Sequence, residues 1–174
     1  MDNKKVLILV ESAVVIAMAL ALSQMRLFRL PQAGSVTLAM VPLVVLAYRR
    51  GAKAGLMAGI ALGLLRLTLD AYVVHWAQFL LDYPLAFGLV GLAGFFPNRK
   101  FLGVVVGYLG RLLCHFAAGF VFFAEFAPEG TPVAVYVFMY NISFILPEAI
   151  ITFAVLYWLF PRLQEALPTN RDAR

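Results

Sequence analysis

Long apolar runs separated by short polar segments dominate the pattern of this chain. Six such runs occupy residues about 6–25, 36–48, 54–69, 72–96, 101–126 and 133–160. In a run such as 6–21 nearly every position is apolar, which lacks the alternation of a membrane β-strand and is typical of a helix with apolar surroundings on all sides. A bilayer core about 30 Å thick requires about 20 helical residues per crossing. The pattern therefore predicts an all-α polytopic membrane protein, a bundle of six transmembrane helices in which the second and third are the shortest.

The composition indicates that lipid is the main solvent of the protein. Hydrophobic residues make up 63% of the 174 positions, charged residues make up 13%, and the mean hydropathy is +0.90. Soluble domains average about 45–50% apolar and about 25% charged residues. These values exclude a soluble enzyme, and we expect residues 1–174 to form a single integral membrane domain.

The basic residues are distributed unequally between the two sides of the predicted bundle. Only Arg26 and Arg29 fall on one side. The other side holds Lys4, Lys5, Arg49, Arg50, Lys53, Arg99, Lys100, Arg162, Arg171 and Arg174. Because loops rich in Lys and Arg stay in the cytoplasm, both termini are predicted to be cytoplasmic. The net charge of +5 does not indicate nucleic-acid binding, since the basic residues lie scattered in twos and threes.

Small residues recur at helical spacing in two of the runs. Gly51, Gly55, Gly59 and Gly63 form one row, and Ala13, Ala17 and Ala21 form another. Such rows allow helices to approach closely in lipid. We expect the glycine row to pack inside the protein, whereas the alanine row is equally compatible with a lipid-facing side and with a partner interface.

Asp82 is an acidic residue inside the fourth run, and ionisable groups in membrane spans are functional candidates by default. It could face a positively charged ligand, or it could form an internal ion pair with Arg66 or Arg111. Pro84 follows by two residues and is expected to kink or open the helix there.

The last two runs add polar groups that could line the same pocket. His115 and Gly119 repeat with Arg111 at intervals of four, so the three share one helix face. Tyr136 lies one turn before Tyr140. The polar residue Asn141 follows Tyr140 directly. The histidine could equally be a packing residue, and the tyrosines could form an interfacial belt. An outward-facing pocket of this composition suits a small, flat, cationic molecule that forms hydrogen bonds.

Motifs of catalysis and cofactor binding are missing from the sequence. It has no glycine-rich phosphate loop, no Gly-x-Ser-x-Gly elbow and no histidine pair at metal-chelating helical spacing. We therefore expect no enzymatic activity, no cofactor and no metal site.

Several short stretches of the chain form a recognisable set. They are YRRGAKAG at 48–55, LLDY at 80–83, HFAAG at 115–119 and FAPEGTPV at 126–133, followed by Tyr136 and the pair at 140–141. Together they resemble the thiamine-specific substrate-binding subunit (S component) of energy-coupling factor (ECF) transporters. The match runs in order from about residue 11 to residue 161. The resemblance implies a six-helix protein of the bacterial cell membrane that binds thiamine from outside with high affinity. It also implies separate partners that supply the energy, namely a transmembrane coupling subunit and two ATP-binding subunits.

The resemblance further implies which residues bind. Asp82 matches the acidic residue that faces the cationic thiazolium, and Tyr83 follows it as in the family. The polar groups around the aminopyrimidine are matched by His115, Tyr136 and Asn141. Gly119 matches a glycine under the ligand, Tyr72 an aromatic residue near the thiazolium, and Phe123 a further aromatic wall. On the first helix, Ala13 and Ala17 match an alanine motif that contacts the coupling subunit.

The chain departs from some family members at three positions. It has Asp82 where some have glutamate, and Phe123 where some have tryptophan; another tryptophan of the first outer loop falls near its Ala33. Losing two large rings reduces the stacking area. Two alternatives stay open: the same architecture with a thiamine precursor or another vitamin, and a membrane scaffold or enzyme that transports nothing.

Overall fold

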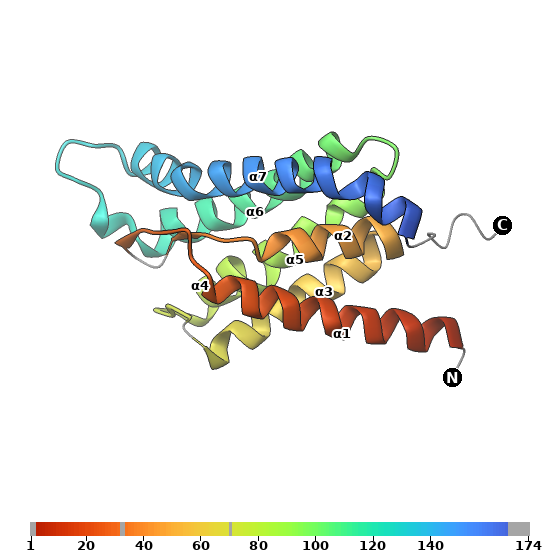
Figure 1. Ribbon diagram of the computed structural model, residues 1–174. Helices are drawn as coiled ribbons and strands as arrows, with labels where there is room; N and C mark the ends of the chain where they lie inside the picture. The colour runs from red at the N-terminus through yellow and green to blue at the C-terminus, as the bar shows by residue number, and fades with distance from the viewer. Residues whose placement is uncertain (1–2, 32–33, 70, 167–174) are drawn as a thin grey trace.

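The computed structural model describes residues 3–31, 34–69 and 71–166, and these residues form an elongated all-α bundle (Figure 1). Within them, the segments long and apolar enough to cross a membrane are Asn3–Gln24, Trp76–Phe95, Lys100–Phe122 and Val133–Arg162. The main helices are α1 (Asn3–Gln24), α2 (Met40–Arg50), α3 (Ala52–Leu65), α4 (Trp76–Leu80), α5 (Ala86–Val90), α6 (Lys100–Phe122) and α7 (Val133–Ala166). The predicted all-α class is confirmed.

The second and third helical segments are shorter than a bilayer crossing. Helix α2 has 11 residues and α3 has 14. At 1.5 Å per residue they extend about 16 and about 21 Å, less than the hydrocarbon core of about 30 Å. They are joined at Gly51, whose φ of 89° suits glycine. The predicted spans 36–48 and 54–69 correspond in the structure to the helices Met40–Arg50 and Ala52–Leu65.

Short strands and a 3₁₀ turn, rather than α-helix, extend the chain beyond the ends of α2 and α3. Before α2, the strands β1 (Phe28–Arg29) and β2 (Ser35–Val36) pair antiparallel, with Phe28 opposite Val36. After α3, the chain forms the short 3₁₀ turn η2 (Arg66–Thr68). The sequence pattern did not predict this small hairpin, because strands of two residues are too short to show an alternation.

The fourth crossing is an irregular helix. It begins at Trp76 rather than at 72, and it runs through α4, the π-helical turn η3 (Leu81–Leu85), α5 and the 3₁₀ segment η4 (Gly91–Phe95). Pro84 lies inside η3, where it lacks an N–H and its ring would clash with the carbonyl of a regular α-turn. The wider π turn relieves that clash, which is the opening expected at this proline.

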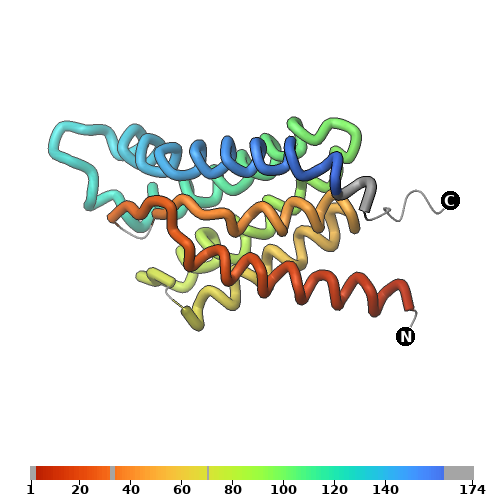
Figure 2. The backbone as a smooth tube through the Cα atoms, viewed as in Figure 1, coloured from red at the N-terminus to blue at the C-terminus, as the bar shows by residue number. Residues whose placement is uncertain are grey.

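The last two crossings also differ at their ends from the predicted 101–126 and 133–160. Helix α6 ends at Phe122 and is followed by the 3₁₀ turn η5 (Ala124–Phe126), while α7 continues to Ala166. The start of α1 and the end of α7 lie at the same end of the bundle (Figure 2). Both ends lie together in this way when a chain passes through the bundle an even number of times.

Three members of the glycine row, Gly55, Gly59 and Gly63, pack inside the protein as predicted, whereas Gly51 is half-buried and has open space around it. A Cβ atom on Gly59 would lie 2.7 Å from the carbonyl carbon of Phe87, and one on Gly55 would lie 3.0 Å from Cα of Gly91. Helix α3 can therefore lie directly against the backbone of the fourth crossing. A Cβ on Gly63 would likewise lie 2.6 Å from Cα of Pro84, so α3 also packs directly against η3, the turn that carries Asp82.

Candidate ligand-binding pocket

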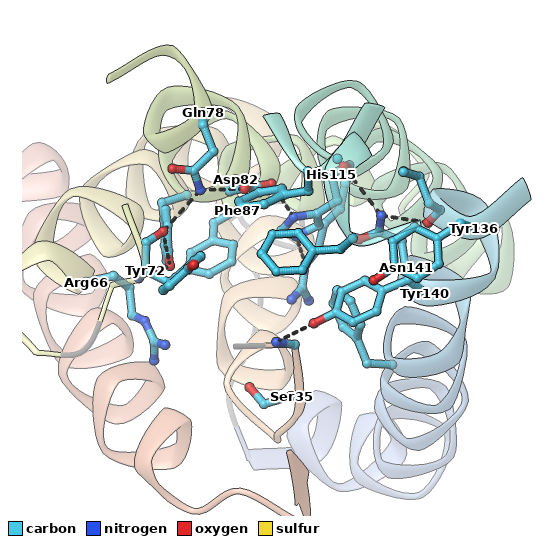
Figure 3. A pocket seen from close by; sticks show the side chains of 18 residues that line it. Ser35, Arg66, Tyr72, Gln78, Asp82, Phe87, His115, Tyr136, Tyr140 and Asn141 are labelled. Carbon is cyan, nitrogen blue, oxygen red and sulfur yellow. Dashed lines mark hydrogen bonds and ion pairs between the residues drawn. The ribbon is translucent and has the colours of Figure 1, made fainter. Parts of the chain in front are cut away.

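A pocket opens between the last three crossings (Figure 3). The elements that line it meet at the end of the bundle opposite the start of α1 (Figure 1). All eight residues that the sequence singled out for binding line it: Tyr72, Asp82, Tyr83, His115, Gly119, Phe123, Tyr136 and Asn141. The fold brings them together from the approach to α4, from η3, from α6 with the residue after it, and from α7. Their roles toward a ligand remain predictions.

Asp82 projects into this pocket from the π turn and is held by two side chains. Its Oδ1 lies 2.7 Å from Nδ1 of His115, and its Oδ2 accepts a hydrogen bond of 2.6 Å from Nε2 of Gln78. The side chain is 14% exposed. The alternative of an ion pair with Arg111 does not occur, because Arg111 pairs with Glu148 instead. The carboxylate is thus shielded from bulk water but open to the cavity.

His115 uses both of its ring nitrogens within the protein. Nδ1 faces Asp82, and Nε2 accepts a hydrogen bond of 3.3 Å from Nε of Arg111. The ring also packs edge-on against Phe144, with centroids 5.7 Å apart. In this arrangement one ring nitrogen contacts Asp82 and the other contacts Arg111.

Asn141 is buried on α7 and presents its carbonyl oxygen. Its amide nitrogen donates to the carbonyl oxygens of Val137 at 2.9 Å and His115 at 3.4 Å. These two bonds occupy both amide hydrogens, so Oδ1 is the atom left to accept a bond from a ligand. Gly119 makes room for this contact, since a Cβ there would lie 2.6 Å from Cγ1 of Val137 and 3.5 Å from Nδ2 of Asn141.

Aromatic side chains form the walls. Tyr72 and Phe123 stack with centroids 6.0 Å apart near the opening, and Tyr136 lies 6.2 Å from Tyr140. The buried Tyr83 anchors the segment before α4, because its hydroxyl oxygen accepts a 2.7 Å bond from the backbone N–H of Tyr72. Such faces suit a flat cation.

The hairpin before α2 covers one side of the pocket and is attached to α7 through Tyr140. The hydroxyl of Tyr140 accepts a 3.1 Å bond from the backbone N–H of Gly34 and donates to the carbonyl oxygen of Pro31. Gly34 and Ser35 line the pocket next to this attachment. A Cβ on Gly34 would lie 2.8 Å from the tyrosine hydroxyl, so glycine is needed for the contact.

Sequence reasoning missed several lining residues, above all Gln78. Its Nε2 also donates to the carbonyl oxygen of Tyr72, while its Oε1 accepts from the backbone N–H of Val74. In the sequence, its position one helical turn before Asp82 indicates that the two side chains share a helix face. Tyr140 was noted in the helix-face pattern but not chosen as a site residue.

The two alanines proposed for a partner interface lie away from the pocket. Ala13 and Ala17 are exposed on α1, which packs on α2 and α3 through its opposite side, where Ala19 and Ser23 are buried. Ala33, the other position at which the chain departs from some family members, lies outside the described residues.

Comparison with known proteins gives consistent matches over nearly the whole chain. A family model described as thiamine transporter protein matches residues 9–167. The thiamine transporter ThiT of Bacillus subtilis is 36% identical over 184 residues, covering 93% of this chain and 96% of the relative. The thiamine transporter ThiT of Lacticaseibacillus paracasei is 32% identical over 175 residues, covering 89% and 87%.

A solved structure agrees with these sequence matches. The structure of ThiT from Listeria monocytogenes has a TM-score of 0.86 and 26% identity, and the match covers 94% of this chain and 98% of that chain. The chain therefore belongs to the thiamine transporter protein family, and it is a multi-pass membrane transport protein rather than an enzyme.

Proposed function

We propose that the protein captures thiamine in the pocket around Asp82 as the substrate-binding subunit of an ECF-type uptake transporter. The observation that carries the proposal is a shielded carboxylate, hydrogen-bonded to Gln78 and His115 and set among aromatic rings. The relatives named thiamine transporter support this choice of ligand. Thiamine joins a cationic thiazolium to an uncharged aminopyrimidine, so it requires one anion and a set of neutral polar contacts.

The geometry suggests how each half of thiamine is held. The thiazolium lies against Asp82 between the rings of Tyr72, Phe123 and Tyr136, where ion pairing and cation–π attraction act together. The exocyclic amino group of the pyrimidine donates to Oδ1 of Asn141. His115 acts by holding Asp82 rather than by reading the pyrimidine edge.

The residues that line the pocket provide no machinery for driving transport, so energy comes from partners in this proposal. A transmembrane coupling subunit and two ATP-binding subunits form the energising module, and the exposed Ala13 and Ala17 on α1 contact the coupling subunit. Small residues at this spacing let another helix approach closely in lipid. The whole chain acts as a single integral membrane domain of the bacterial cell membrane, with the basic end of the bundle in the cytoplasm.

Calorimetric titration of the purified protein with thiamine tests the proposal. We expect saturable one-to-one binding, and we expect the uncharged pyrimidine half alone to bind much more weakly. Quenching of tyrosine and tryptophan fluorescence provides a second readout, because Tyr72 lines the pocket and Trp76 begins α4. A flat titration in both measurements would reject thiamine as the ligand.

A further inference from the structure

The hydrogen bonds of His115 determine where its proton lies. Nε of Arg111 carries a hydrogen and has no lone pair to offer, so it can only donate to Nε2 of His115 at 3.3 Å. Nε2 must then be the unprotonated nitrogen. The proton of the ring lies on Nδ1, from which it is donated to Oδ1 of Asp82 at 2.7 Å.

Arg111 is itself held in place from the other side. Its guanidinium forms an ion pair with Glu148, which is 1% exposed, and the second carboxylate oxygen of Glu148 accepts a 2.9 Å bond from the hydroxyl of Thr37. The buried pair thus fixes the direction of the Arg111 Nε–H bond. A continuous chain of contacts leads from α7 through α6 to Asp82 on η3.

The charge of the site depends on this arrangement. Among the described residues, the pocket and the small cavity that shares its lining hold two carboxylates, Asp82 and Glu148, and two arginines, Arg66 and Arg111. If His115 is neutral, the two negative and two positive charges balance. The side chains that contact Asp82 directly then carry no charge that offsets its own. An imidazolium at His115 would neutralise Asp82 and make the whole set positive, which repels a cation.

We propose that Arg111 is a positioning residue that keeps His115 neutral and so preserves the negative charge of Asp82 for a cationic ligand. The identity of the ligand in this inference rests on the proposed function, whereas the protonation state of His115 does not depend on it. The donor from Arg111 occupies the lone pair that a second proton would need.

Nitrogen NMR of the unliganded protein tests the tautomer directly. The chain has only two histidines, and the structure gives them opposite tautomers. Nδ1 of His75 accepts from the backbone N–H of Ala77, which places the proton of neutral His75 on Nε2. In protein labelled with ¹⁵N-histidine at mildly alkaline pH, we expect one ring protonated on Nδ1 and one on Nε2. The variant H75Q removes the signals of His75 and so assigns those of His115. A His115 ring that is doubly protonated, or protonated on Nε2, would overturn the proposal.

A paired substitution tests the role of Arg111. Arg111→Leu together with Glu148→Gln removes both charges at once, and the glutamine can still accept from Thr37. We expect His115 to gain a proton on Nε2. Thiamine affinity should fall by about 10- to 100-fold, and affinity for the uncharged pyrimidine half by less than about threefold.

The matched control is the pair of Arg50, at the end of α2 away from the pocket, with Glu11, which also contacts Arg49. Arg50→Leu with Glu11→Gln should leave the His115 spectrum and both affinities unchanged. If the Arg111 double variant keeps a neutral His115 and full selectivity for thiamine, Arg111 does not set the charge. Failure of the wild type to bind thiamine would instead reject the proposed function, since the tautomer is read without ligand.

Discussion

Replacing Asp82 by asparagine changes the charge of the pocket with almost no change in shape. The asparagine carbonyl oxygen can still accept a hydrogen bond from Nδ1 of His115. Its amide nitrogen, however, faces Nε2 of Gln78, and both groups are hydrogen-bond donors. Gln78 cannot turn over without losing its bonds to the backbone of Tyr72 and Val74. The substitution therefore removes an anion and leaves one donor without its acceptor.

The expected loss follows from the distance and the surroundings of the carboxylate. A thiazolium about 5 Å from Asp82 gains about 3 kcal/mol at an effective dielectric constant of about 20. The side chain is 14% exposed, so solvent screens part of this attraction. We expect D82N to weaken thiamine binding by about 2–3 kcal/mol, which is roughly 30- to 160-fold in Kd.

Calorimetry on the purified variant measures this loss. The uncharged pyrimidine half serves as a second ligand, and its affinity should fall far less than that of thiamine. Glu125→Gln is the matched control, because Glu125 is an exposed carboxylate in the short turn η5 and does not line the pocket. Equal losses for thiamine and for the pyrimidine half, or no loss at all, would refute the assignment of Asp82 to the cation.

Three further predictions concern other parts of the molecule. Asn141→Ala should weaken thiamine binding by about 1–3 kcal/mol in the same titration, because the ligand loses its acceptor; unchanged affinity would remove Asn141 from the site. Ala13→Leu with Ala17→Leu should leave thiamine binding intact and abolish thiamine uptake by cells, and full uptake would exclude this face as the contact with the coupling subunit. Gly59→Ala should lower the midpoint of thermal unfolding far more than Gly110→Ala, since a Cβ at Gly59 meets backbone whereas one at Gly110 meets the side chain of Leu89; equal shifts would contradict the packing argument.

Much of the pocket could be predicted because helical spacing fixes which side chains share a face. Arg111, His115 and Gly119 lie at intervals of four on α6, and all three line the cavity. An acidic residue and an asparagine inside apolar runs are conspicuous in a sequence, since lipid tolerates neither without a partner. For this reason Asp82 and Asn141 stand out from the sequence alone.

Contacts between distant segments left no comparable signal. The bond from Gly34 to Tyr140 joins residues 106 positions apart, and the pairing of Arg111 with Glu148 selects one of several possible carboxylates. Gln78 is an ordinary amide in the sequence, and only its 2.6 Å bond to Asp82 reveals its importance. Tertiary geometry decides such partners, so spacing along one helix cannot predict them.

The part of the fold that the sequence predicted least well is also the part that creates the pocket. Helices α2 and α3 stop short of the pocket end of the bundle, and the segments that flank them, with Gly34 and Ser35 on one side and Arg66 on the other, line the cavity. Irregular backbone at membrane depth is stable only where protein or a polar cavity satisfies its hydrogen bonds. Full-length helices would fill this space with side chains and satisfy their own backbones, leaving no room for a ligand beside Asp82. The two short helices, which the pattern predicted only as the shortest of six spans, therefore leave the space for a binding site inside so small a bundle.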